Sequence, residues 1–244
     1  MMNNDPTTLV QRNIGDIVAD NYHAAGVFKE FGIDFCCGGG LPLGEVCERK
    51  GINPDQVTLK LSTMPTGGTT VNQKFNLWEP DFLIDYIINN HHTFVRTKTE
   101  EILVYAAKVA NVHGERHPEN IEIYQLFAKL SNELIQHLQD EEQTVFPLIK
   151  NIHLQIKNGE EVNEKLANQL RAELDHMIDD HEGAGDIMKE IRSLSNDFTP
   201  PADACATYQI LYQNLAGFEE DLHQHVHLEN NILFKKAETL LSDL

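Results

Sequence analysis

The chain has 244 residues, of which 41% are hydrophobic and 23% are charged, and its formal net charge at pH 7 is −19. This length and composition are typical of a globular protein of one or two domains, with room for a hydrophobic core. The strong negative charge excludes nucleic acid and anionic lipid as expected partners, because both would be repelled.

The sequence gives no sign of export or of membrane insertion. It contains no run of about 18 apolar residues, the length that a membrane-spanning helix needs. Residues 1–6 carry neither a basic nor an apolar segment, which argues against a signal peptide. The four cysteines are too few for a disulfide framework in a chain of this length. We therefore expect a cytoplasmic protein with reduced thiols and no membrane partner.

Residues 7–60 predict a small helical domain. Short helical patterns separated by Gly and Pro cover residues 14–20, 22–31 and 42–50. A linker is expected at 61–78, because residues 62–70 are rich in Thr, Gly and Pro.

Residues 79–244 predict four long helices. Apolar residues recur at helical spacing over approximately 79–110, 118–151, 162–194 and 203–241. The breaks between them are short, so neighbouring helices should be antiparallel. The sequence therefore predicts an all-α protein, in which a small helical domain precedes an antiparallel four-helix bundle.

One motif occurs twice within the predicted bundle. A histidine and a glutamate lie four residues apart, followed five residues later by a phenylalanine: His137, Glu141 and Phe146, then His225, Glu229 and Phe234. Residues four apart lie on the same face of a helix. The repetition makes this pattern far more informative than a single His-Glu pair, which is common on helix surfaces.

Each copy is preceded by one further histidine at nearly the same distance. His92 lies 45 residues before His137, and His181 lies 44 residues before His225. Four antiparallel helices would bring these imidazoles and the two carboxylates to one interior location. Imidazoles with carboxylates, and no nearby thiolate, are the ligands of a di-iron or di-manganese site in a helix bundle.

Some of the remaining histidines compete for these positions. His223 and His227 are also four residues apart, but only His225 keeps the register of the repeat. His176 points about 140° away from His181, and only His181 keeps the repeat spacing.

The choice between His91 and His92 stays open at this point. Helical periodicity favours His91, which has more apolar helical neighbours, whereas the spacing of the repeat favours His92.

The second unusual feature is the adjacent pair Cys36 and Cys37, followed by the glycines 38–40. Adjacent cysteines form a disulfide only with strain, and glycines let the backbone approach another group closely. Two thiols on a flexible loop suit transient metal binding, redox chemistry or reaction with nitric oxide. Cys47 and Cys205 lie in helical patterns and are expected to be packing residues.

With these motifs the chain resembles the repair-of-iron-centres proteins, a family of iron–sulfur cluster repair proteins with a di-iron centre. The resemblance covers nearly the whole chain. It rests on the segments 34–39, 137–147, 180–181 and 225–231. The first segment is similar to the signature of the family's N-terminal domain, and the others are similar to its hemerythrin-like domain. The resemblance places the first histidine ligand at His92.

The resemblance implies two non-haem iron ions joined by an oxygen bridge and held by six residues: His92, His137, Glu141, His181, His225 and Glu229. It also implies a stress protein that restores iron–sulfur clusters damaged by nitric oxide or oxidants. Damaged iron–sulfur proteins would be its clients, and nitric oxide or oxygen its small ligands. Iron donation, with Cys36 and Cys37 as a thiol relay, is favoured over an enzymatic activity.

Two other functions stay open. One is the reduction of nitric oxide at the di-iron site, with the thiols as reductant. The other is oxygen binding or sensing, as in hemerythrins. That role requires a fifth histidine four residues before the third-helix ligand, where this chain has Met177. The oligomeric state is also left open, with a homodimer as one alternative.

Overall fold

The computed structural model describes residues 6–64 and 74–242. Helices account for all of the regular secondary structure in these two stretches, so the predicted all-α class is confirmed. Backbone contacts divide the chain into two compact units. One comprises Ile84–His225, and the other combines the residues up to Leu83 with Val226–Ser242.

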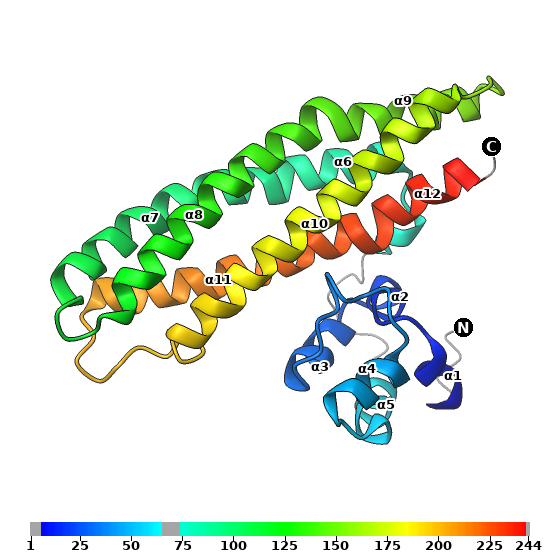
Figure 1. Cartoon of the computed structure of the whole chain (residues 1–244). Helices are drawn as coiled ribbons and strands as arrows, with labels where there is room; N and C mark the ends of the chain where they lie inside the picture. The colour runs from blue at the N-terminus through cyan, green and yellow to red at the C-terminus, as the bar shows by residue number, and fades with distance from the viewer. Residues whose placement is uncertain (1–5, 65–73, 243–244) are drawn as a thin grey trace. The chain divides into compact units, whose positions relative to one another are not determined.

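Four long helices form the bundle, as the sequence predicts (Figure 1). Three of them are continuous but consist of several segments. These are α6 (Pro80–Ile87), η2 (Ile88–His92) and α7 (Thr93–His113); α8 (Glu119–Asp140), η3 (Glu141–Val145) and α9 (Phe146–Lys157); and α11 (Ala206–Leu228), η4 (Glu229–Leu233) and α12 (Phe234–Ser242). The remaining helix is α10 (Glu164–Leu194). Its 31 residues correspond to a length of about 46 Å.

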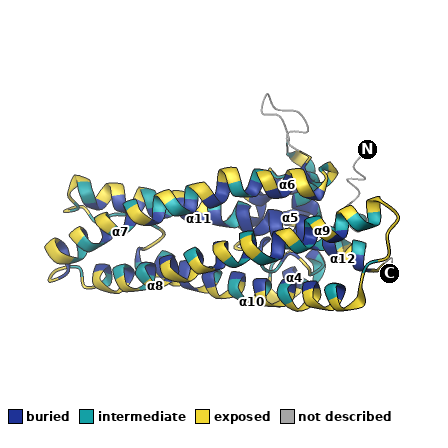
Figure 2. Ribbon diagram, turned by 90° about the horizontal axis from the view of Figure 1, so that it is seen from above, coloured by how far each residue is buried: buried dark blue, intermediate teal, exposed yellow. Residues whose placement is uncertain are grey.

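Each bundle helix has one apolar face, and these faces form the core. In α8 the buried apolar positions recur every three or four residues: Ile123, Phe127, Leu130, Leu134 and Leu138. Figure 2 shows the same division along the bundle helices, with buried positions facing inward and exposed ones outward. Burying each of these side chains stabilises the fold by about 1.5–3 kcal/mol. No helix in the described part of the chain is both long and apolar enough to cross a membrane.

The segments η2, η3 and η4 are π-helical, which means that each contains one residue more than a regular α-helical turn. The sequence predicted uninterrupted helices here. In η3 one cause is visible. Pro147 has no N–H to donate to the carbonyl of Gln143, and the wider turn before it accommodates the missing bond.

Besides Val226–Ser242, the described residues of the other unit form five short helices and one 3₁₀ turn. They are α1 (Pro6–Gln11), α2 (Ile14–Asp20), α3 (Ala24–Glu30), α4 (Leu43–Lys50), α5 (Pro54–Thr63) and η1 (Phe75–Leu77). The patterns at 14–20, 22–31 and 42–50 correspond to α2, α3 and α4, whereas α1 and α5 were not foreseen. The helix α5 begins at a cap, where the Asn53 side chain accepts a hydrogen bond of 2.9 Å from the Asp55 N–H. Much of the Thr-rich segment falls in residues 65–73, which lie outside the described residues, and the domain limits at 60, 61 and 78 stay a prediction.

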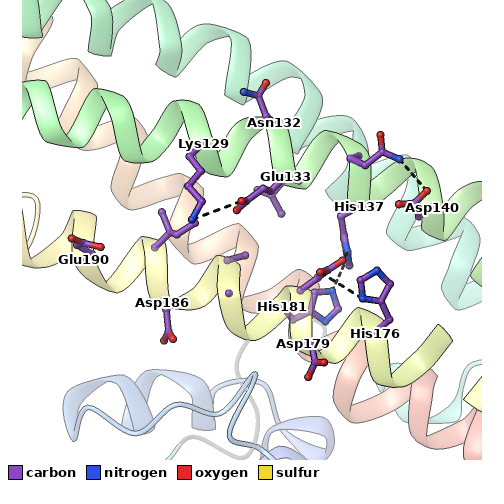
Figure 3. Close-up of a pocket in the computed structure, with 16 residues that line it drawn as sticks. Lys129, Asn132, Glu133, His137, Asp140, His176, Asp179, His181, Asp186 and Glu190 are labelled. Atoms are coloured by element: carbon purple, nitrogen blue, oxygen red, sulfur yellow. Dashed lines mark hydrogen bonds and ion pairs between the residues drawn. The ribbon is translucent and has the colours of Figure 1, made fainter. Parts of the chain in front are cut away.

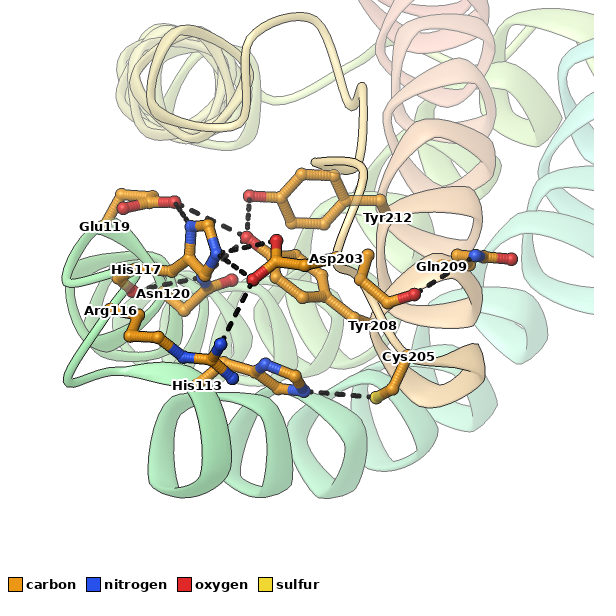
Figure 4. A network of polar contacts seen from close by, with 11 residues as sticks. His113, Arg116, His117, Glu119, Asn120, Asp203, Cys205, Tyr208, Gln209 and Tyr212 are labelled. Carbon is orange, nitrogen blue, oxygen red and sulfur yellow. Dashed lines mark hydrogen bonds and ion pairs between the residues drawn. The ribbon is translucent and has the colours of Figure 1, made fainter.

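A polar network joins the start of α11 to the turn between α7 and α8 (Figure 4). His117 Nε2 lies 3.1 Å from the Asp203 carboxylate, and the Asn120 amide donates to the Tyr208 hydroxyl at 2.7 Å. Cys205 is exposed, with its Sγ 3.2 Å from His113 Nε2, so the expectation that it packs in the core is wrong. It precedes the first residue of α11 and therefore lies in the connecting loop. Cys47 is fully buried, as expected.

The turn between α10 and α11 has an unusual backbone. Asn196, Asp197 and Phe198 adopt positive φ angles of 49°, 54° and 54° in succession, a conformation that side chains other than glycine rarely take. Arg192 stabilises this turn. It donates to Asp197 at 3.0 Å and lies 4.9 Å from the centre of the Phe198 ring.

Candidate metal centre

The six residues of the repeated motif are all buried side chains of the long helices. They are between 0 and 4% exposed: His92, His137, Glu141, His181, His225 and Glu229. Three of them lie at the π-helical segments, since His92 ends η2, Glu141 begins η3 and Glu229 begins η4. The local widening of each helix thus occurs where a candidate ligand faces the interior, as is common for π-helical turns.

These six residues form two overlapping groups, in each of which the potential ligand atoms lie within 4.8 Å of one another. One group is His92, Glu141, His225 and Glu229, and the other is His137, Glu141, His181 and Glu229. Each group supplies two imidazoles, and both share the same two carboxylates. Two neighbouring positions with shared carboxylates are the arrangement expected of a di-metal site.

The two oxygens of Glu141 face different histidines. Its Oε2 lies 3.3 Å from His92 Nε2, and its Oε1 lies 3.5 Å from His137 Nε2. One carboxylate therefore faces both groups at once. A carboxylate in this position can bind one cation through each oxygen and offset the repulsion between them.

Carboxylates outside the groups fix the orientation of the histidine rings. Glu142 lies 2.7 Å from His92 Nδ1, and Asp180 lies 3.1 Å from His137 Nδ1. When Nδ1 carries the proton and donates it to a carboxylate, Nε2 keeps its lone pair for a cation. The Nε2 atoms of His137 and His181 face each other at 2.9 Å.

Glu142 was not singled out by the sequence. It is the second residue of η3, and its role becomes visible only when η2 and η3 are packed together. Although burial raises its pKa, hydrogen bonds from His92 and Arg96 hold the pKa of this carboxyl below its usual value. Glu142 is therefore ionised and suited to accept a hydrogen bond from the Nδ1–H group of His92.

The chemistry of the donor set fits hard or borderline divalent cations. The groups offer nitrogen and carboxylate oxygen and no sulfur, which suits iron or manganese better than a structural zinc ion. Two carboxylates that are fully buried, Glu141 and Glu229, are costly unless cations offset their charge. The residues present therefore fit a di-metal centre.

The structure brings His92, and not His91, into these groups. The ring of His91 stacks on that of His225, with 5.5 Å between ring centres and 7° between ring planes. Its Nδ1 lies 3.0 Å from the Asp221 carboxylate. His91 thus packs against the centre from outside, although helical periodicity alone favoured it.

Exchanging each of these adjacent histidines for glutamine provides a matched test. We expect His92→Gln to lower the metal content per chain by at least half, because it removes an imidazole from one group. We expect His91→Gln to leave the metal content unchanged. Elemental analysis of both purified variants measures this, and equal losses in the two would contradict the assignment.

Two other histidines lie away from the groups. His176 is largely exposed on α10. His227 is buried, with its ring 5.8 Å from that of Phe35 and 6.2 Å from that of Tyr22. Burial lowers the pKa of His227 to about 3, so its imidazole is neutral and contributes to packing.

A cavity of about 750 Å³ between α8 and α10 is lined in part by His137 and His181 (Figure 3). Most of its charged lining residues are acidic: Glu133, Asp140, Asp179, Asp180, Asp186 and Glu190. One lysine, Lys129, lies among them. The negative potential of such a cavity favours cations over anions near these histidines.

The cysteine pair lies in a loop organised by Asp34. Its Oδ1 accepts hydrogen bonds of 3.1 Å from the backbone N–H groups of both Cys36 and Cys37. The two Sγ atoms are 3.9 Å apart, and all four cysteines of the chain are free thiols. A hydrogen bond with Cys37, burial and nearby negative charge raise the pKa of the Cys36 thiol well above its usual value.

A bundle of four long helices that encloses two His/Glu groups defines a hemerythrin-like cation-binding protein. Residues 83–237 match the hemerythrin HHE cation binding domain, and residues 10–64 match ScdA_N, a domain of unknown function. The chain belongs to the family of iron–sulfur cluster repair proteins with this two-domain composition.

Several relatives match over most of their length. The chain is 31% identical to the iron-sulfur cluster repair protein ScdA of Staphylococcus epidermidis, over 92% of this chain and 96% of that protein. It is 32% identical to the probable iron-sulfur cluster repair protein of Haemophilus influenzae, over 94% and 98% respectively. It is also 28% identical to the iron-sulfur cluster repair protein YtfE of an Enterobacter species, over 92% and 95%. The resemblance inferred from the sequence is confirmed.

Proposed function

We propose that this protein holds two iron ions in the His/Glu groups and repairs iron–sulfur clusters damaged by nitric oxide or oxidants by supplying ferrous iron to them. The observation that carries the proposal is the pair of buried groups that share Glu141 and Glu229. The names of the relatives that match over nine tenths of the chain support the choice of iron–sulfur proteins as clients.

In this proposal each side chain has a defined role. The four histidines would hold two irons, with His92, His137 and His181 offering Nε2, and Glu141 and Glu229 would be shared between the two ions. Glu142 and Asp180 keep His92 and His137 in the tautomer that leaves Nε2 available. The iron pair would supply an exchangeable store of ferrous ions. The acidic cavity beside His137 and His181 would favour a cation that leaves the His/Glu groups for the solvent. A reducing compartment such as the cytoplasm is part of the proposal, because the described cysteines are free thiols.

Oxygen carriage is less well supported. The position four residues before His181 is Met177, whose side chain is completely buried and offers no imidazole. The chain therefore lacks a fifth histidine at this point of α10. Reduction of nitric oxide stays the main alternative, since the same iron pair and thiols would serve it.

Iron transfer can be measured directly. The iron-loaded full chain is mixed with an iron–sulfur enzyme whose cluster has been damaged by nitric oxide, in the presence of sulfide and a thiol. We expect recovery of client activity in step with loss of iron from this protein. Steady consumption of nitric oxide with a reductant, without loss of iron, would instead identify a nitric oxide reductase.

The relay role of the thiol pair has its own test. Replacing both Cys36 and Cys37 by alanine should leave the iron content unchanged, because neither belongs to the His/Glu groups. Client reactivation in the same assay should fall to the background rate. The double variant Cys47→Ala and Cys205→Ala is the matched control and should repair normally. Full repair by the Cys36/Cys37 variant would show that the thiols are not a relay.

A further inference from the structure

The loop that carries the cysteine pair contains a second kind of ligand cluster. Asp34, Cys36 and Cys37 each place one potential ligand atom within 4.8 Å of the other two. The Sγ atoms are 3.9 Å apart, and Cys36 Sγ lies 3.1 Å from Asp34 Oδ1. The set is two thiols and one carboxylate, a donor chemistry different from that of the His/Glu groups.

These separations are close to those that a tetrahedral cation imposes. With metal–sulfur bonds of about 2.3 Å, two thiolates on one ion lie about 3.8 Å apart. A thiolate and a carboxylate oxygen on the same ion lie about 3.5 Å apart, for metal–oxygen bonds of about 2.0 Å. A disulfide would need the sulfurs at about 2.05 Å. The loop thus holds its thiols at the spacing of a chelate and not of a disulfide.

Backbone contacts hold the loop in this shape without a cation. The N–H groups of Cys36, Cys37 and Gly38 all point at Asp34 Oδ1, at 3.1, 3.1 and 3.5 Å. Folding therefore places the three side chains next to one another, and a cation would not have to order the loop itself.

A side chain from the distant C-terminal region fastens the same loop within this unit. Asn231, in η4, is buried, and its Nδ2 donates to the carbonyls of Phe35 and Cys36 at 3.2 and 2.9 Å. The segment η4, which begins with Glu229, thus binds the backbone carbonyls before and after the Cα atom of Cys36.

Two glycines make room for this contact. A Cβ atom added at Gly15 or at Gly39 would overlap the side-chain amide of Asn231. The two glycines also bond to each other, since the Gly15 N–H donates to the Gly39 carbonyl at 2.8 Å. The Asn231 amide therefore sits in a slot that only glycine at both positions leaves open.

We propose that Asp34, Cys36 and Cys37 form a separate mononuclear site for a borderline-soft divalent cation, with Asn231 as the positioning residue that fixes the loop. Binding replaces two S–H protons by one cation, and both protons pass to the solvent. Zinc and ferrous iron have the matching ligand preference. That ferrous iron is the ion carried there rests on the proposed function, whereas the site itself does not.

Cobalt(II) is the probe, because thiolate ligation gives it an intense near-ultraviolet charge-transfer band. The full chain, already loaded with iron, is titrated with cobalt(II). We expect one equivalent to bind with this band and with release of two protons, while the iron content stays constant. The single variants Cys36→Ser and Cys37→Ser should each lose most of the band. The variants Cys47→Ser and Cys205→Ser, which alter the other two free thiols, should keep it.

Two further variants separate ligation from loop structure. Asp34→Asn keeps an oxygen that accepts the loop N–H groups but removes the charge, and should weaken cobalt(II) binding at least about tenfold. Asn231→Ala should weaken binding while the iron content and the number of reactive thiols stay unchanged. The neighbouring change Asn230→Ala is the matched control and should have no effect.

The inference is wrong if the iron-loaded chain binds no cobalt(II) with thiolate absorption, or if the band persists in both Cys36→Ser and Cys37→Ser. It is also wrong if cobalt(II) appears only as iron is lost, since the cation would then occupy the His/Glu groups. None of these readouts depends on client repair. A protein that fails to repair clusters can still bind cobalt(II) in the loop, and a protein that repairs them can fail to do so.

Discussion

Replacing Glu141 by glutamine is expected to lower the bound iron from about two ions per chain to less than half an ion. The reason is that Glu141 belongs to both His/Glu groups and directs one oxygen toward each. A neutral amide of the same size cannot offset the charge of two cations. Elemental analysis of the purified variant, after an attempt to reload it with ferrous iron, measures the effect.

The same variant should keep its fold. Without metal, a fully buried carboxylate is costly, so metal-free Glu141→Gln should unfold at a temperature no lower than metal-free wild-type protein. Glu133→Gln alters a largely exposed carboxylate on α8 and serves as the control, with normal iron content. Two irons bound to Glu141→Gln would rule out Glu141 as a bridging ligand.

Replacing Arg192 by methionine should lower the free energy of unfolding by about 3–5 kcal/mol. Arg192 donates to the buried carboxylate of Glu219 through both Nε and Nη2, and this interaction raises the pKa of its guanidinium. Loss of the guanidinium leaves the Glu219 charge buried without its partner. The turn at Asp197 and Phe198 also loses the contacts that hold its positive φ angles. Chemical denaturation of metal-free protein measures the change.

A second substitution identifies the cause. In the double variant Arg192→Met, Glu219→Leu no charge is buried, so most of the lost stability should return. Lys189→Met removes an exposed ion pair with Asp186 on the same helix and should change stability by less than about 1 kcal/mol. If the double variant is as unstable as the single one, the loss in free energy of unfolding comes from the positive-φ turn and not from the buried charge.

The sequence predicted what depends on periodicity and repetition. The apolar spacing identified four helices, and the duplicated His-Glu motif with its upstream histidines identified five of the six residues that form the two buried groups. The sixth, His92, was chosen over His91 only through the family resemblance. Periodicity alone favoured His91, but η2 is π-helical and both imidazoles are buried there, and only His92 contributes an atom to the His/Glu groups.

Contacts between distant parts of the chain were beyond such reasoning. Nothing in the sequence near Glu142 indicates that it faces His92, since that contact depends on how η2 and η3 pack. The link between Asn231 and the cysteine loop spans nearly 200 positions. The cysteine loop was expected to be flexible because of its glycines. Two hydrogen bonds from Asn231 fix it instead, and Gly39 leaves the space that the Asn231 side chain occupies.

The π-helical turns also determine which single-residue insertions and deletions the bundle helices can tolerate. In a regular helix, deleting one residue rotates everything beyond it by about 100° and turns its apolar face outward. At Glu229–Leu233 or Glu141–Val145, loss of one residue would leave a normal helix whose two halves keep their faces toward the core. One codon gained or lost at these points separates a plain bundle of helices from one whose acidic side chains reach the interior. The helical scaffold can therefore be kept when the metal-binding chemistry is lost.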